Sequence, residues 1–141
     1  MEGISYERIE TLRKGSSEPV VEAARAASNK KASGITILDV SALLVITDHF
    51  LICSASNERQ VRTIADEIER RVLAECDIKP ARREGERESR WVVQDYVDFV
   101  VHVFHEGARD YYDLERLWSD APVVRVKDLE ATDEPVPAEA T

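Results

Sequence analysis

The feature that most constrains the fold is the run of residues 99–104, whose two alternating faces are both apolar. In a strand, successive side chains point to opposite sides of the sheet. The odd positions of this run are all apolar, and the even positions are apolar except at His102. A strand of this kind must be covered on both sides, so we expect a central strand in a sheet with helices on each face.

Two earlier segments have the periodicity of amphipathic helices. The first follows Ser17-Glu18-Pro19, which offers a capping serine and a proline in the first turn. The second begins after Asn57, a residue able to cap a helix, and Gln60 resembles the far end of a capping box. Its apolar stripe extends to about Glu75 and comprises Val61, Ile64, Ala65, Ile68 and Val72. We expect both helices to pack on the sheet.

The intervening runs are rich in strand-forming residues. Pro80 suits an edge strand, and residues 97–98 suit a tight turn between two strands. The expected strands are 35–40, 50–54, 79–83, 91–96, 99–104 and a short piece at 123–126, with a further apolar stretch at 43–46. Because helices and strands interleave, the sequence predicts an α/β fold with a mixed β-sheet.

The last predicted helix includes the segment from Tyr111 to Trp118. Helical spacing puts Tyr111, Leu114 and Trp118 on one apolar stripe with Ala108. Tyr112 falls off that stripe, between two arginines. It could lie at the edge of the core with its hydroxyl in water, or it could contact a partner protein.

The length of 141 residues suits one domain with a full core. We expect a flexible arm over residues 1–16, an α/β domain over 17–126 and a disordered acidic tail over 127–141, because the tail lacks any core-forming periodicity. The formal net charge is −9, from 28 acidic and 19 basic residues. This charge disfavours direct binding to nucleic acid and suits a basic protein partner.

The cysteines and the N-terminal segment bear on location. Cys53 and Cys76 are too far apart for a metal knuckle or a redox pair, so we expect reduced thiols. The N-terminal segment lacks the order of a secretory signal, and no apolar run approaches the roughly 18 residues that cross a membrane. We therefore expect a cytoplasmic protein.

Candidate catalytic groups form no specific arrangement. Asp95 and Asp98 could bind a divalent cation, but a spacing of three puts them on opposite faces of a strand, so they are better suited to supporting the turn. Cys53 and His102 could form a nucleophile and its base, but both lie in predicted buried strands. No glycine-rich loop offers to hold phosphates. We expect no enzymatic activity, no cofactor and no metal site.

Trp91 opens a predicted strand after a charged loop, so its indole is expected at a margin of the sheet. With Tyr112 and Trp118 it could supply the aromatic residues that anchor a protein interface. Core packing explains Trp91 and Trp118 equally well. The missing catalytic arrangement favours the interface.

Seven short motifs follow one another along the chain in a fixed order. They comprise Asp39-Val40, Ile46 to Ser54, Ser56 to Val61, Arg83-Glu84-Gly85, Trp91 to Tyr96, Val100 to Phe104 and Tyr111 to Trp118. Together these motifs resemble the Iojap family, whose bacterial members are called ribosomal silencing factor S. The resemblance covers roughly residues 18–120 and leaves both terminal segments outside it.

The resemblance implies a nucleotidyltransferase-like fold without the transferase active-site residues. It also implies binding to a basic ribosomal protein, number fourteen of the large subunit, on the surface that faces the small subunit. A factor bound there blocks joining of the subunits and represses translation when nutrients are short. Because family members are commonly dimeric when free, the resemblance also implies a possible homodimer for this chain. A large-subunit assembly factor and a metal-dependent nucleotidyltransferase are the alternatives.

Positions that match the family's binding surface are carried over as expected partner-binding residues. They are Trp91, Asp95, Tyr112, Leu114, Glu115, Trp118 and Glu84. The acidic members are expected to face arginine or lysine, and the aromatic members to fill apolar hollows. Asp39, Asp48 and His102 also match, and we interpret them as structural polar groups with hydrogen-bond partners.

Overall fold

In residues 18–126, the part of the chain that the computed structural model describes, six strands form one sheet in the order β3-β4-β5-β2-β1-β6. Their bounds are β1 Ser33–Asp39, β2 His49–Ala55, β3 Arg82–Glu84, β4 Trp91–Asp95, β5 Phe99–His105 and β6 Val123–Val124. Strands β2 and β5 are parallel, and the other neighbouring pairs are antiparallel. The predicted mixed α/β class is confirmed. The predictions for residues 1–16 and 127–141 lie outside the described range.

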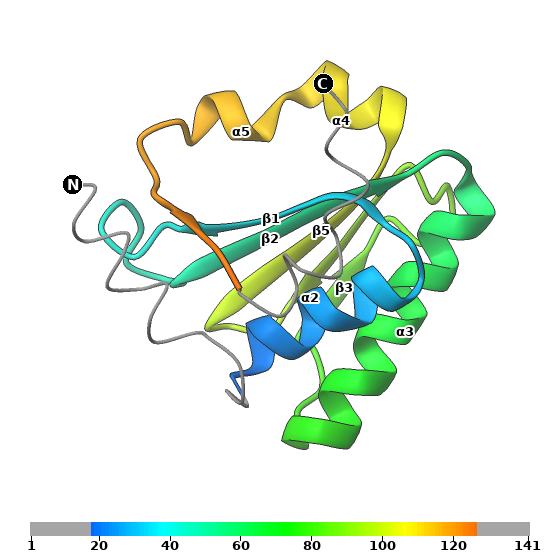
Figure 1. Cartoon of the computed structure of the whole chain (residues 1–141), viewed down its shortest axis with the longest axis horizontal. Coiled ribbons are helices and arrows are strands. Elements are labelled where there is room, and N and C mark those ends of the chain that lie inside the picture. The colour runs from blue at the N-terminus through cyan, green and yellow to red at the C-terminus, as the bar shows by residue number, and fades with distance from the viewer. Residues whose placement is uncertain (1–17, 127–141) are drawn as a thin grey trace.

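Helices cover the sheet on both faces, as Figure 1 shows. Their bounds are α2 Pro19–Asn29, α3 Glu58–Cys76, α4 Glu106–Tyr112 and α5 Leu114–Leu117. Helices α2 and α3 lie on one face, and α4 with α5 lies on the other. Strand β5 lies between β4 and β2, so its central position is confirmed. Its Val101 and Val103 belong to one core and its Phe104 to the second.

The two predicted amphipathic helices are confirmed. Pro19 is the first residue of α2, and the small apolar residues of this helix are buried, which lets it pack closely on the sheet. Asn57 caps α3 by accepting a hydrogen bond from the Gln60 backbone N–H over 2.8 Å. The Gln60 side chain instead donates to the backbone oxygens of Lys30 and Lys31, so the reciprocal half of a capping box is not formed. Every predicted stripe residue of α3 is fully buried.

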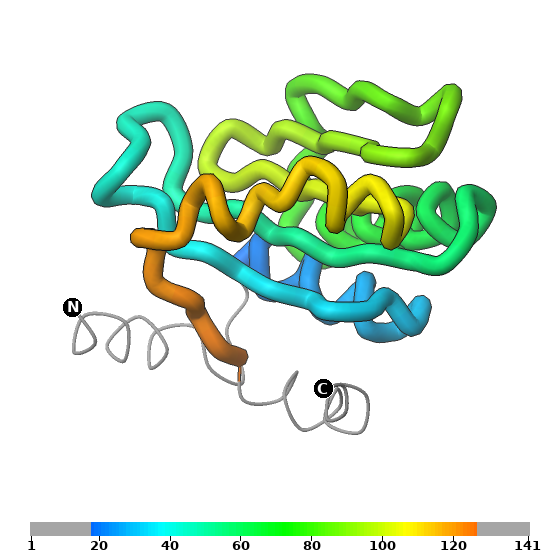
Figure 2. Tube along the Cα trace, turned by 90° about the horizontal axis from the view of Figure 1, so that it is seen from above, coloured from blue at the N-terminus to red at the C-terminus, as the bar shows by residue number. Residues whose placement is uncertain are grey.

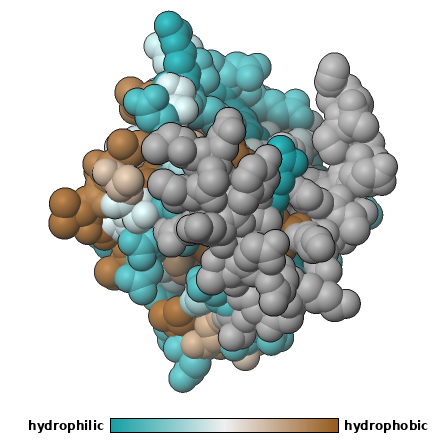
Figure 3. All heavy atoms as spheres, turned by 60° about the vertical axis from the view of Figure 1, so that its left-hand side comes forward, coloured by the Kyte–Doolittle hydropathy of each residue, from teal (hydrophilic) through white to brown (hydrophobic). Residues whose placement is uncertain are grey.

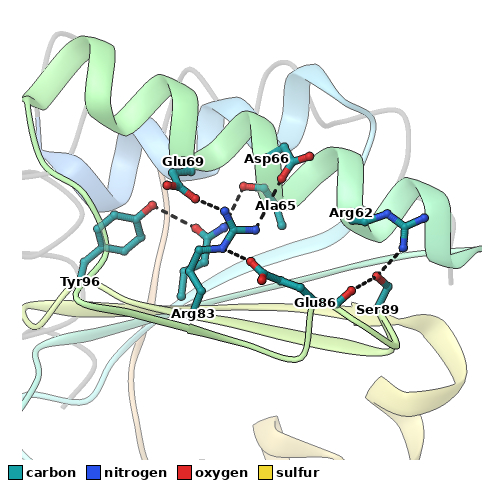
Figure 4. Close-up of polar contacts among 9 residues, drawn as sticks. Arg62, Ala65, Asp66, Glu69, Arg83, Glu86, Ser89 and Tyr96 are labelled. Carbon is teal, nitrogen blue, oxygen red and sulfur yellow. Dashed lines mark hydrogen bonds and ion pairs between the residues drawn. The ribbon is translucent and has the colours of Figure 1, made fainter.

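Polar contacts attach α3 to the β3–β4 hairpin (Figure 4). The Arg83 guanidinium of β3 forms ion pairs with Glu69 and Glu86, and it lies 3.5 Å from Asp66. Deeper in the fold, the Gln94 side-chain amide donates to the Ala65 backbone oxygen over 2.8 Å. The Gln94 amide is fully buried, so this bond satisfies a polar group that would otherwise destabilise the core.

Two predictions about local structure are wrong. The apolar stretch 43–46 is part of a loop between β1 and β2, and Val45 and Ile46 are 99% and 78% exposed. Figure 3, which brings the left-hand side of Figure 1 forward, shows hydrophobic side chains at the surface of this end of the molecule. The stretch therefore adds no piece to the sheet, because the backbone turns after Val40.

The second error is the single helix expected across Tyr111 to Trp118. The helix stops at Asp113, whose φ of 52° lies in the left-handed region that aspartate adopts more readily than most residues. Leu114 and Ala108 still face the core, but Tyr111 is 80% exposed instead of lying on the buried stripe. Because the helix is broken at Asp113, residues before and after the break do not share one helical face.

The loop between β3 and β4 requires glycine at one position. Gly85 has φ of +87°, and a Cβ placed there would lie 2.0 Å from the Trp91 backbone oxygen. We predict that Gly85→Ala lowers the free energy of unfolding by about 2 kcal/mol or more, because both the backbone conformation and the contact become unfavourable. Urea denaturation followed by circular dichroism measures this change.

Gly107 in α4 provides the matched control. A Cβ there would meet nothing closer than 3.5 Å, and alanine favours a helix, so Gly107→Ala should leave stability unchanged or raise it by up to about 1 kcal/mol. Equal stability of Gly85→Ala and the wild type would contradict the prediction.

Candidate partner-binding site

The strand register puts several of the expected site residues on one face of the sheet. Trp91 of β4 is paired with Phe104 of β5, and Glu84 of β3 is paired with Val93 of β4. Cross-strand partners point to the same side. Since Phe104 packs in the core under α4 and α5, the side chains of Trp91, Val93, Asp95 and Glu84 all point to that side. Seen from above in Figure 2, α4 and α5 lie over the middle of the sheet, with β4 and then the edge strand β3 to one side.

Aromatic rings run from the core to the surface at the edge of α4. The Trp91 ring stacks on Phe104 with centroids 4.9 Å apart, and it also contacts Tyr112 at 4.7 Å. Tyr112 is 51% exposed and touches Tyr111 edge-on. The structure therefore brings Trp91 and Tyr112 together although they are far apart in the sequence. Tyr112 therefore lies half-exposed at the edge of the core, a position that fits both interpretations of this residue.

Two acidic residues lie on the same face of the sheet as these rings, nearer its β3 edge. Glu84 is exposed on the edge strand β3, and Asp95 is partly exposed on β4. A shallow hollow there is lined by Arg82, Glu84, Val93 and Asp95. Three of these four lining residues are charged, and the fourth is a valine.

Asp95 also stabilises the β4–β5 turn, as its spacing from Asp98 predicted. Its carboxylate accepts a hydrogen bond from the Val97 backbone N–H over 2.8 Å, and Val97 has φ of 76°. The same carboxylate lies 3.5 Å from the Arg82 guanidinium. Because the turn and the ion pair hold this side chain, the position of its charge is largely fixed.

The other three expected site residues lie across α5. Leu114 is 8% exposed and packs in the core, and Trp118 is partly buried with its ring edge-on to Phe50 at 5.4 Å. Glu115 is partly exposed, and its carboxylate pairs with the Arg109 guanidinium. Leu114 and Trp118 thus support this face mainly from beneath, whereas Glu115 lies at its surface.

Arg109 is a residue whose role the sequence did not indicate. Its guanidinium lies against β1 and β2, where it donates to the Ser33 backbone oxygen over 3.4 Å and to the Ser54 hydroxyl over 3.2 Å. Its remaining nitrogens bind Glu115. The Arg109 side chain therefore links α4 and α5 to the sheet. The sequence alone could not indicate this role, because the contact between Arg109 and Glu115 depends on the helix break at Asp113.

The polar residues interpreted as structural have the expected partners in two cases. The Asp39 carboxylate accepts from the Ser41 backbone N–H over 3.0 Å and from its hydroxyl over 2.6 Å. The His102 imidazole accepts from the Trp91 indole N–H over 3.1 Å. Asp48 contributes through its backbone, which hydrogen-bonds to Val40 and Asp98.

The candidate nucleophile and base do not meet. Cys53 belongs to the core beneath α2 and α3, whereas His102 contacts Phe50 and Phe104 on the opposite face. Burial raises the pKa of the Cys53 thiol to about 12, so it carries no thiolate at neutral pH. Among residues 18–126, no group of three histidine, cysteine, aspartate or glutamate side chains is placed to hold a metal ion. No helix in that range is long and apolar enough to cross a membrane.

Known proteins are similar to this chain in sequence and in fold. Residues 13–141 match the family described as ribosomal silencing factor during starvation. The ribosomal silencing factors RsfS of Halalkalibacterium halodurans and Bacillus subtilis are 44% and 45% identical to this chain. The matches cover 74% and 72% of it, and 89% and 85% of the two relatives. The chloroplastic protein Iojap of Zea mays is 29% identical over 75% of this chain and 46% of its own length.

A solved structure agrees with these sequence matches. A crystal structure of a Bacillus halodurans protein is 40% identical, covers 78% of this chain and 99% of its own, and superposes with a TM-score of 0.67. The class defined by this fold is thus a mixed α/β domain shared by bacterial and chloroplast proteins. The chain belongs to the RsfS family of ribosomal silencing factors, as its resemblance to Iojap proteins predicted.

The buried imidazole predicts a pH dependence of stability. Burial lowers the pKa of His102 to about 4, whereas the unfolded chain takes up this proton near pH 6.5. The unfolded state therefore binds more protons between these values, and folding stability must fall as the pH falls from 6.5 to 4. We predict that this single group accounts for roughly 3 kcal/mol of that loss.

Unfolding free energies of the wild type and His102→Asn, measured in urea between pH 7 and 4.5, isolate the contribution. Carboxylates titrate in both proteins, so only the difference between the two curves matters. Parallel curves would contradict the assignment.

Proposed function

We propose that this protein binds the large ribosomal subunit through its basic ribosomal protein number fourteen and sterically blocks joining of the small subunit, repressing translation under nutrient limitation. Membership of the RsfS family supports a role in silencing ribosomes. The net charge of −9 supports a basic protein as the direct partner, with little direct contact to nucleic acid.

The observation that supports the proposal is the contact between Trp91 and Tyr112 on a face of the sheet that also carries two carboxylates. Tryptophan and tyrosine dominate the binding energy of many interfaces, especially where they lie in a preformed arrangement. Glu84 and Asp95 lie on the same face and project negative charge from it. Aromatic rings bordered by acids suit a surface of lysines and arginines around apolar hollows.

The proposed mechanism requires only that the protein binds the large subunit and that its bulk excludes the small subunit. A typical specific interface buries about 800 Å² on each partner, and a few aromatic anchors suffice for tight binding. The sheet and its two helical layers then form a rigid body that occupies the space of the incoming subunit. In this proposal no bond is made or broken, so the protein acts without enzymatic activity.

The proposal predicts a dose-dependent loss of subunit joining. Purified large subunits are incubated with this protein, small subunits are added, and the particles are separated on a sucrose gradient. Joined ribosomes should decrease as the protein approaches a one-to-one ratio with large subunits, and the protein should migrate with the large subunit. Unchanged joining despite saturating protein would overturn the proposal.

The binding face is tested by Tyr112→Ala and Trp91→Ala. Each should weaken binding to large subunits at least about tenfold, or about 1.4 kcal/mol, because truncation removes an aromatic anchor. Val45→Ala is the matched control, since it also removes exposed apolar surface but lies in the β1–β2 loop. Wild-type affinity in both folded site variants would exclude this face.

A further inference from the structure

The imidazole of His102 lies directly behind the Trp91 indole. Its Nδ1 accepts the indole N–H over 3.1 Å, and the histidine is 8% exposed. The Phe50 ring packs on it edge-on at 5.0 Å, and Phe104 lies nearly parallel to it at 6.3 Å. Ile52 and Val93 are its cross-strand partners, so apart from the indole N–H the named neighbours of this imidazole are aromatic or aliphatic.

The hydrogen bond determines which nitrogen carries the proton. An indole N–H only donates, so the Nδ1 that accepts it must be unprotonated, and the neutral ring carries its proton on Nε2. The Nε2 atom is buried and has no hydrogen-bond partner among residues 18–126. Leaving a buried donor unpaired destabilises a fold, and an apolar side chain would fill this place without that cost.

Core packing alone therefore does not account for a histidine at this position. What the imidazole adds over a leucine is an acceptor for the Trp91 side chain. We propose that His102 is a positioning residue, whose hydrogen bond fixes the Trp91 indole in the orientation that the partner-binding face requires. This inference rests on the proposed function, because it explains how the aromatic face is held ready for its partner.

The geometry supports fixation of the indole from several sides. The Phe104 ring stacks on one side of it, Tyr112 contacts it from α4, and His102 holds its polar edge. Stacking leaves a ring able to slide and rotate in its plane, whereas a hydrogen bond to Nε1 restricts that rotation. A binding residue that is already ordered loses less freedom when the partner docks.

The test compares two substitutions of similar size. His102→Asn puts an amide oxygen on the same carbon that carries Nδ1, so an acceptor is retained, whereas His102→Leu offers none. We expect His102→Leu to weaken binding to large subunits about fivefold and His102→Asn to stay within about twofold of the wild type. Trp91→Phe removes the indole N–H, and adding His102→Leu to it should cause no further loss.

Val103→Ala controls for simple destabilisation. Val103 lies in the same strand, is fully buried and points to the opposite core, so it should lower stability without changing affinity. Equal affinities of the wild type, His102→Asn and His102→Leu would overturn the positioning role. A fivefold loss of affinity in His102→Leu would also overturn it if Val103→Ala lost affinity to the same extent.

A second measurement does not depend on the ribosome. The protein has two tryptophans, so its proton NMR spectrum should contain two indole N–H signals. The signal that disappears in Trp91→Phe belongs to Trp91. This signal should exchange slowly with solvent in the wild type and in His102→Asn, and at least about tenfold faster in His102→Leu. Unchanged exchange in His102→Leu would exclude the positioning role, whereas failure of the wild type to bind large subunits would refute the proposed function alone.

Discussion

Burial of β5 on both faces is the constraint on which the rest of the structure depends. Because β5 pairs in parallel with β2, the chain between them must cross over the sheet, and α3 provides that crossover. The second face of β5 then needs its own cover, which α4 and α5 supply immediately after the strand ends. The short length of this second cover leaves part of the face open, and the candidate site lies there.

The elements that sequence patterns predicted well are those whose periodicity reflects burial. The stripe of α3 and the two apolar faces of β5 repeat with the period of their structure, so they report directly on what is buried. The loop around Val45 and the break at Asp113 are different. Both depend on local backbone conformation, and hydrophobic patterning contains no information about a single left-handed residue.

The candidate site likewise combines features that the sequence predicted with features that only the structure reveals. Resemblance to a family supplied the residues, and the strand register explains why Trp91, Asp95 and Glu84 share a face. The contact between Trp91 and Tyr112 could not be derived from spacing, because it depends on how α4 lies across the sheet. Arg109 fixes that placement through hydrogen bonds to two strands, and its partners lie more than fifty residues earlier in the chain.

The position of Trp91 should make the intrinsic fluorescence of this protein sensitive to binding at the candidate site. Its indole is partly buried next to a half-exposed tyrosine, whereas Trp118 packs against Phe50 across α5. Emission of an indole shifts to shorter wavelength when water leaves its surroundings. Any molecule that settles on this part of the sheet should therefore change the intrinsic fluorescence, and binding can be followed without attaching a dye.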